Sequence, residues 1–355
     1  MQGCLFCFFI FIQSMKEKEF QQVQEIGFGS LIEKLSGYSG KKREEILQGI
    51  GDDAAVFEGR KGEISLISSE IFLEGVHFDL SYHPFQHLGY KLVSAAVSDI
   101  YAMNAHPLQL LVNIAIPNKY SVQMVEQFYK GVDAACKDYE IEVSGGDTTA
   151  SHQLLAVSVA VTGSAVKENL VYRKGAKDKD LICVTGDLGS AIAGLRILMR
   201  EKKFWKESGQ EIFQPDLGDY EYVVKRQLIP AARSELLKVF EETGLKPDSM
   251  IDLTQGLVAD AKEIAKASGL GLEIYSPAVP ISLETRKVAD EMKEDVDKYA
   301  FYGGEDYEML FTISEDNAEK LRNSFEDFSV IGTMTAEHHE MRINTGEDKT
   351  IQLEL

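Results

Sequence analysis

The stretch HLGYKLVSAAVSDIYAMNA, residues 87–105, is followed closely by LQLLVNIAIP, residues 108–117. In the first stretch, apolar residues recur every four positions from Leu88 to Ile100, which predicts an amphipathic helix. The second stretch is a short run rich in leucine, isoleucine and valine, which predicts a buried strand. Because helical and strand patterns alternate in this way along the chain, the predicted fold class is α/β or α+β.

The same two patterns recur in further segments on both sides of this pair. Strand patterns occur at residues 63–70, 154–165, 180–186, 249–254, 271–275, 308–314 and 328–334. Helical patterns occur at residues 121–139, 188–202, 230–244 and 256–269. These segments predict two groups of strands with helices between them.

A polar stretch with charges of both signs, KENLVYRKGAKDKD at residues 167–180, divides the chain. The 355 residues are enough for two domains, each with its own core. We therefore expect an N-terminal domain over residues 15–165, a C-terminal domain over residues 166–345 and a short tail over residues 346–355.

The composition limits the classes of partner. The chain carries 57 Asp and Glu residues against 37 Lys and Arg, a formal net charge of -20. Such an acidic chain is not expected to bind nucleic acid or an anionic membrane surface. A phosphorylated substrate would also be repelled unless it arrived with metal ions.

The first residues and the cysteines bear on the location of the protein. Residues 1–14, MQGCLFCFFIFIQS, contain an apolar run that is too short to span a bilayer and lacks signal-peptide features. We interpret them as sequence upstream of a cytosolic start, with a membrane anchor as the alternative. Cys4 and Cys7 form a C-x-x-C without a second pair, whereas Cys136 and Cys183 lie in apolar stretches. The last two predict buried thiols in a reducing compartment, the cytoplasm.

Six stretches place an acid among small or hydroxyl-bearing residues at the end of an apolar run. Each alone is more often a turn or a helix cap than a ligand set. Together, the acids would repel one another unless cations lay among them. Because hard cations prefer oxygen ligands, the set predicts a site with several Mg²⁺ for a polyphosphate. The stretches are GIGDDAAVF (49–57), SSEIFLEGVHF (68–78), VSDIYAMNA (97–105), VSGGDTTAS (143–151), MIDLTQGLVAD (250–260) and YGGEDYEML (302–310).

The ordered motifs GIGDDAAVF, LEGVHF, SDIYAMNA, SGGDTT, VTGDLGSA and GGEDYE resemble those of the thiamine-monophosphate kinase family, in the aminoimidazole-ribonucleotide synthetase superfamily. P-loop, protein-kinase and Rossmann motifs are absent from the chain, which excludes those nucleotide-binding folds. The resemblance implies two α/β domains and a homodimer formed through the N-terminal domains. It also implies that ATP binds with several Mg²⁺ between the domains and phosphorylates thiamine phosphate to thiamine diphosphate by in-line transfer.

The resemblance also assigns roles to individual residues. The implied metal ligands are Asp53, Ser68, Ser69, Glu70, Asp99, Asp147 and Asp252. The implied contacts to ATP are Tyr129, Gly146, Asp147, Arg173 and Thr254, and those to the thiamine portion are His77 and Glu305. No catalytic general base is expected, because the attacking phosphate, with a second pKa of about 6, is already largely ionised near neutrality.

The chain departs from the family pattern at three places. Glu70 stands where the family has aspartate, Gln255 replaces the acid of an S-D-G motif, and the C-terminal aromatic segment of many members is missing. Two alternative functions therefore stay open: another ATP-dependent reaction of the superfamily, or a degenerate nucleotide- or thiamine-phosphate-binding protein with little turnover. From the residues alone, His77 could be a core or turn histidine and Arg173 a solvated side chain, and His83 is expected at the surface.

Overall fold

The computed structural model describes residues 23–36, 43–59, 63–209, 213, 215–346 and 349–355. The predictions for residues 1–14, including Cys4 and Cys7, fall outside the described residues. The chain divides into two compact units, Met1–Ile46 and Leu47–Leu355. In the first unit, helix α2 (Val23–Ser36) is kinked at Gly27, where φ is 73°.

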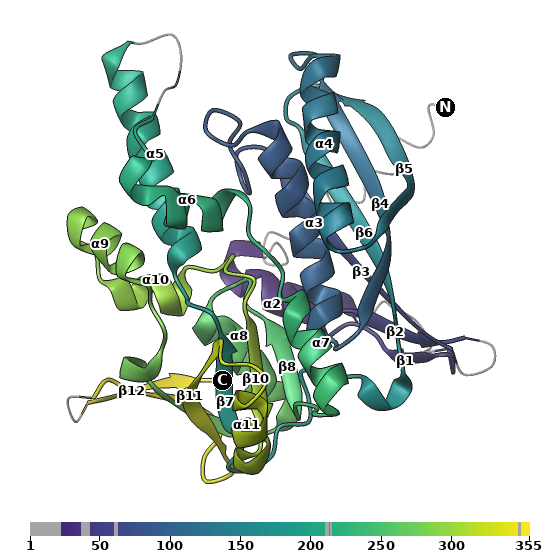
Figure 1. The fold of residues 1–355 in the computed structure, drawn as a ribbon, viewed down its shortest axis with the longest axis vertical. Coiled ribbons are helices and arrows are strands. Elements are labelled where there is room, and N and C mark those ends of the chain that lie inside the picture. Colours follow the sequence, from purple (N-terminus) through teal and green to yellow (C-terminus); the bar gives the residue numbers. More distant parts are fainter. Residues whose placement is uncertain (1–22, 37–42, 60–62, 210–212, 214, 347–348) are drawn as a thin grey trace, which may run out of the picture. The chain divides into compact units, whose positions relative to one another are not determined.

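The first of two mixed sheets has the strand order β1-β2-β3-β6-β4-β5 (Figure 1). Strands β4 and β5 are parallel, whereas β3 pairs antiparallel with β2 and β6, and β6 with β4. Helices α3 (Phe85–Ala102) and α4 (Val122–Asp138) pack against each other and contact strands of this sheet. The strands are β1 (Ile46–Gln48), β2 (Ala55–Glu58), β3 (Ile64–Leu73), β4 (His106–Pro117), β5 (Glu142–Ser151) and β6 (Ala156–Ala165).

The second sheet has the order β13-β12-β9-β11-β7-β10-β8, in which only the β12–β9 pair is parallel. Its strands are β7 (Leu181–Thr185), β8 (Ser249–Asp252), β9 (Gly271–Tyr275), β10 (Met309–Ile313), β11 (Phe328–Thr335), β12 (Glu340–Asn344) and β13 (Thr350–Glu354). The helices of this part are α5 (Ser190–Ser208), α6 (Glu221–Leu228), α7 (Ser234–Thr243), α8 (Leu257–Ser268), α9 (Leu283–Met292), α10 (Val296–Tyr302) and α11 (Glu315–Arg322).

Helix α3 is buried almost continuously from Leu88 to Ala102. It packs on strands β3, β4 and β6 and also contacts α4, α6 and β8. The close approach of α3 to α4 needs a glycine, since a Cβ on Gly89 would lie 2.1 Å from the carbonyl oxygen of Phe128. One hydrophobic core therefore combines side chains of α3 with Phe311 of the second sheet. This packing brings the C-terminal half of α3 next to strand β8.

The structure confirms the eight predicted strands and the five predicted helices, within a few residues at their ends. It adds strands β1, β2, β5, β12 and β13 and helices α2, α6, α9, α10 and α11, which the patterns did not predict. Strand β5 is exposed along nearly its whole length and is rich in glycine, serine and threonine, so it lacks the alternation that marks a half-buried strand. The expected tail contains strand β13.

The prediction for two of the cysteines can also be compared with the structure. Cys136 and Cys183 are buried free thiols, as the sequence predicts. Across the described residues, every helix is too short or too polar to cross a bilayer.

Candidate active site

Three of the predicted ligands meet at the junction of the two sheets. Asp53 precedes β2, Asp99 lies in the last turn of α3 and Asp252 ends β8. One carboxylate oxygen from each lies within 4.8 Å of the other two. The side chains are nearly buried, with exposed fractions of 8%, 8% and 2%. We call these three residues the aspartate cluster.

The electrostatics of the aspartate cluster favour a bound cation. Burial raises the pKa of all three carboxyl groups, and for Asp99 the charges of Asp252 and Glu70 raise it further. Oδ2 of Asp53 and Oδ2 of Asp252 are buried and have no hydrogen-bond partner among the described residues. Such oxygens are costly to bury unless a proton or a cation neutralises them. The donor set therefore fits a hard divalent cation such as Mg²⁺.

Strand β3 directs only part of its Ser68-Ser69-Glu70 segment toward the aspartate cluster. The Ser68 hydroxyl donates a hydrogen bond to Oδ2 of Asp99, and Glu70 acts on Asp99 through its charge. Burial raises the pKa of Glu70. Because successive side chains of a strand point to opposite faces, Ser69 faces away from this site and is exposed.

Arg173 supplies a positive charge to the aspartate cluster. Its Nη2 lies 2.6 Å from Oδ1 of Asp53, and its backbone N–H donates to Oδ1 of Asp52 at 3.1 Å. Burial, followed by the charge of Asp53, raises the pKa of Asp52 to about 7. Asp52 thus anchors the segment that carries Arg173, while Asp53 faces the cluster. Arg173 is therefore not a solvated surface side chain, which was the alternative interpretation from the residues alone.

The loop after β8 is held in one conformation by an acid that the sequence analysis did not single out. Oδ2 of Asp260 accepts the backbone N–H groups of three successive residues, from Thr254 to Gly256, at 3.0, 3.0 and 3.1 Å. Asp260 lies in the first turn of α8, where an acid is favoured by the free N–H groups of the helix start. The loop presents Thr254 half-buried and Gln255 exposed.

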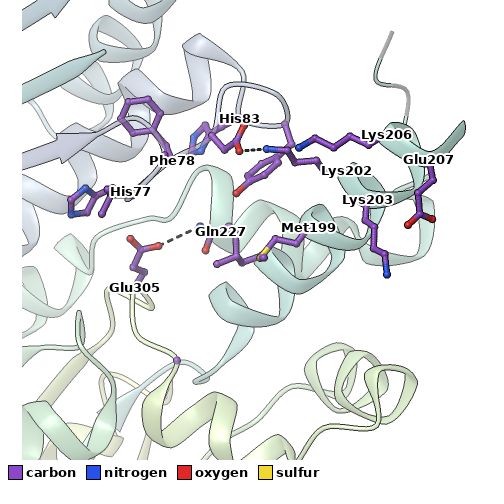
Figure 2. A pocket seen from close by; sticks show the side chains of 16 residues that line it. His77, Phe78, His83, Met199, Lys202, Lys203, Lys206, Glu207, Gln227 and Glu305 are labelled. Atoms are coloured by element: carbon purple, nitrogen blue, oxygen red, sulfur yellow. Dashed lines mark hydrogen bonds and ion pairs between the residues drawn. The ribbon is translucent and has the colours of Figure 1, made fainter. Parts of the chain in front are cut away.

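A cavity of about 740 Å³ contains both residues predicted to contact the thiamine portion (Figure 2). Its lining comes from the segment between β3 and α3, from α5, from Gln227 of α6 and from the loop before β10. His77 Nδ1 accepts the backbone N–H of Leu73 at 3.0 Å, so Nε2 carries the proton of the neutral ring. Tyr307, in the same loop as Glu305, is close enough to both Glu305 and the aspartate cluster for their charges to raise its pKa, in addition to burial.

The remaining predicted site residues lie away from the aspartate cluster and from the cavity. Asp147 and Gly146 are on β5, the edge strand, which is separated from β3 by three strand spacings, about 14 Å. Asp147 pairs with Asn113, an exposed residue, so it points to the sheet face opposite α3. Gly146 is required by strand pairing, because a Cβ there would lie 1.8 Å from the carbonyl oxygen of Val112. Tyr129 is half-buried on α4.

The surface prediction for His83 is wrong. Its side chain is 2% exposed, and burial, with the nearby charge of Lys91, lowers its pKa well below the usual value. The burial of His83 could not be predicted from the sequence, because a single histidine near the start of a helix forms no pattern. Its burial depends on the contact between α3 and α6.

Comparison with known proteins gives consistent results. Residues 51–165 match the family model of the AIR synthase related protein, N-terminal domain, and residues 177–344 match the model of its C-terminal domain. Thiamine-monophosphate kinase of Aquifex aeolicus is 35% identical over 80% of this chain and 85% of the relative, and that of Bacillus subtilis is 32% identical over 77% and 80%. A solved structure of AaThiL complexed with AMPPCP and TMP has a TM-score of 0.79 and 30% identity, and covers 94% of this chain and 99% of that chain.

Proposed function

The chain belongs to the thiamine-monophosphate kinase family, whose members convert thiamine monophosphate to thiamine diphosphate with ATP, and we propose that the reaction occurs beside the aspartate cluster. The observation that carries this proposal is the meeting of three carboxylates within 4.8 Å next to the loop that bears Glu305. A similar protein has been solved with AMPPCP and TMP, which supports both ATP and thiamine phosphate as ligands of this chain.

The aspartate cluster, with Glu70 and Ser68, would hold Mg²⁺. The buried oxygens without hydrogen-bond partners support this assignment, whereas the side chain of Ser69 points to the opposite face of the strand. When bound, Mg²⁺ screens the charges of two phosphate-bearing substrates from each other and stabilises the charge of the transferred group.

The chain's own residues bind and orient the two substrates. Arg173 and Thr254 flank the aspartate cluster and would contact the phosphates of ATP, while His77 and Glu305 would hold the thiamine portion in the cavity. The attacking phosphate oxygen needs no base, since the second pKa of such a group is about 6. Catalysis then consists of placing this oxygen in line with the γ-phosphoryl group and excluding water.

The direct test is to incubate purified protein with Mg²⁺, ATP and either thiamine phosphate or free thiamine. We expect thiamine diphosphate and ADP to form in equal amounts from thiamine phosphate, because the phosphate acceptor must bind beside the metal ions. Preferential turnover of free thiamine, or of neither compound, would contradict the proposal.

Gln255 is expected to set the Mg²⁺ requirement. An amide keeps an oxygen ligand but lacks the full negative charge of the family's acid, so one of several Mg²⁺ should bind weakly. We predict that Gln255→Asp lowers the Mg²⁺ concentration for half-maximal rate by about tenfold, as expected for one added charge near a metal. Gln255→Glu, with a longer side chain, should have a smaller effect. An unchanged Mg²⁺ dependence in both variants would place Gln255 outside the metal site.

We further propose that the chain forms a homodimer through the face of the first sheet that lies opposite α3. This face exposes Ile67, Ile71 and Leu111, with exposed fractions of 46%, 58% and 42%. Exposed apolar side chains gathered on an open sheet face are typical of an interface. Asp147 lies on the same face, in one cross-strand row with Ile71. If a partner subunit packs on this face, Asp147 and Gly146 of this chain would lie near the active site of the partner subunit.

The location that fits this function is the cytoplasm. The buried, unpaired thiols of Cys136 and Cys183 support a reducing compartment.

A further inference from the structure

Lys91 is a buried charge to which neither the motifs nor the proposed mechanism assigns a role. It lies in helix α3, where its neighbours in sequence are apolar, and it is 1% exposed. Burying an ammonium group is costly unless it is paired and hydrogen-bonded. Lys91 Nζ lies 2.9 Å from Oε2 of Glu305 and 3.0 Å from the backbone oxygen of Gln227. The charge is therefore held by two groups that belong to the second half of the chain.

Within the part of the chain that the structure describes, the side chain of Glu305 is held through one oxygen, Oε2. Its Oε2 accepts from Lys91. The same oxygen accepts from Nε2 of Gln227 at 3.3 Å (Figure 2). This arrangement leaves Oε1 able to accept from a group in the cavity, on the side lined by His77. The backbone of Glu305 has a φ of 57° and follows Gly304 with a φ of 71°, so the loop is fixed in a conformation that most residues avoid.

We propose that Lys91 is a positioning residue, which keeps Glu305 ionised and aims its free oxygen at the cationic thiamine portion of the substrate. The inference rests on the proposed function, in which Glu305 contacts this portion. Thiamine carries a thiazolium cation and an aminopyrimidine N–H donor, and an ionised carboxylate binds both more strongly than a neutral carboxyl group does.

The surroundings of Glu305 give this role a pH signature. Burial alone raises the pKa of Glu305, but the charge and hydrogen bond of Lys91, with smaller effects of Gln227 and His77, bring it below the usual value. The other titratable groups that face this carboxylate, Tyr82 and Tyr307, stay neutral, because burial raises their pKa.

Two further charged or titratable sites lie near this pair. His83, beside Lys91, is kept neutral because burial lowers its pKa, and Asp79 is paired with Lys202 at the cavity wall. Without Lys91, burial would dominate, and Glu305 would take up a proton at a higher pH than in the wild type.

The test compares Lys91→Met with the wild type across pH. We expect the KM for thiamine phosphate to rise about tenfold or more at neutral pH, with a smaller change in kcat, as for a lost charge-assisted contact. The ratio of the two KM values should grow as the pH falls from about 8 to about 6, because Glu305 becomes protonated only in the variant. Titration of the substrate phosphate cancels in this ratio.

Two controls separate positioning from general damage. Lys238→Met, on the exposed side of α7, removes an equal charge and should leave KM unchanged. In the Glu305→Gln background, Lys91→Met should add little further increase in KM, because no carboxylate is left to position. If Lys91→Met does not fold, Gln227→Leu, which removes the other hydrogen bond to Glu305, should give a smaller rise in KM with the same pH dependence.

A KM ratio that is flat with pH, or an equal effect of Lys91→Met in the Glu305→Gln background, would overturn the inference while leaving the kinase intact. Failure of the wild type to convert thiamine phosphate would instead overturn the proposed function, and with it this role.

Discussion

Asp99→Asn is expected to lower kcat by about a thousandfold or more, because in the proposed function it removes a ligand of Mg²⁺ and with it several kcal/mol of transition-state stabilisation. The metal-free variant should nevertheless be at least as stable as the wild type. Asparagine keeps the shape of the side chain and an oxygen that can accept from Ser68, but it removes one of three charges held within 4.8 Å. Because burial and neighbouring carboxylates raise the pKa of Asp99, its charge opposes folding when no cation is bound.

The measurements are the rate at saturating ATP and thiamine phosphate, and the thermal midpoint in a chelator. Asp180→Asn is the matched control, since Asp180 is also buried but accepts the backbone N–H of Lys177 at 2.7 Å, away from the aspartate cluster. We expect Asp180→Asn to keep its rate, because Asp180 lies away from the aspartate cluster. If Asp99→Asn instead destabilised the chelated protein and kept its activity, Asp99 would be a structural residue.

Mixing inactive Asp99→Asn and Asp147→Asn subunits is expected to restore about a quarter of the wild-type activity, if subunits exchange at random. The reason is the position of Asp147 on the edge strand, about 14 Å from β3 and on the opposite sheet face from the aspartate cluster. If Asp147 serves the partner's site, half of the dimers in the mixture are mixed, and each of these has one site with both aspartates intact. Each variant alone should be nearly inactive.

The complementation should depend on the dimer. Ile71→Lys, which places a charge on the exposed face in the same cross-strand row as Asp147, should shift the mass measured by light scattering from dimer to monomer and abolish the restored activity. Leu283→Lys is the control, because Leu283 is 80% exposed and lies on α9. If the mixed subunits stayed inactive while exchange was verified, Asp147 would act within its own chain or outside the site.

The sequence predicted those site residues that lie within short, local motifs. Asp53 precedes a short apolar run, whereas Asp99 and Asp252 follow one, and all three lie in motifs that the resemblance assigns to metal binding. Lys91 could not be found in this way, because its partner Glu305 lies 214 residues further along the chain. A lysine in an apolar helix is explained only when the opposing helix and loop are known.

Long-range arrangement decides which of the other motif residues lie near the aspartate cluster. Ser69 shares a motif with Ser68 and Glu70, yet the alternation of β3 turns it to the other face. Asp147 is separated from the aspartate cluster by the strand order of the first sheet, which places β6 and β4 between β3 and β5. Neither the register nor this strand order can be deduced from a six-residue motif. The type and position of the main helices and strands, by contrast, could be predicted from the periodicity of apolar residues.

The order of strands in the two sheets has a consequence for synthesis on the ribosome. All strands of the first sheet lie before residue 166, so this sheet can form while the rest of the chain is still being made. In the second sheet, Asp252 of β8 pairs with Met309 of β10, which is synthesised later. Asp252 therefore joins Asp53 and Asp99 late, and the repulsion among the three carboxylates arises only after the first sheet can have formed.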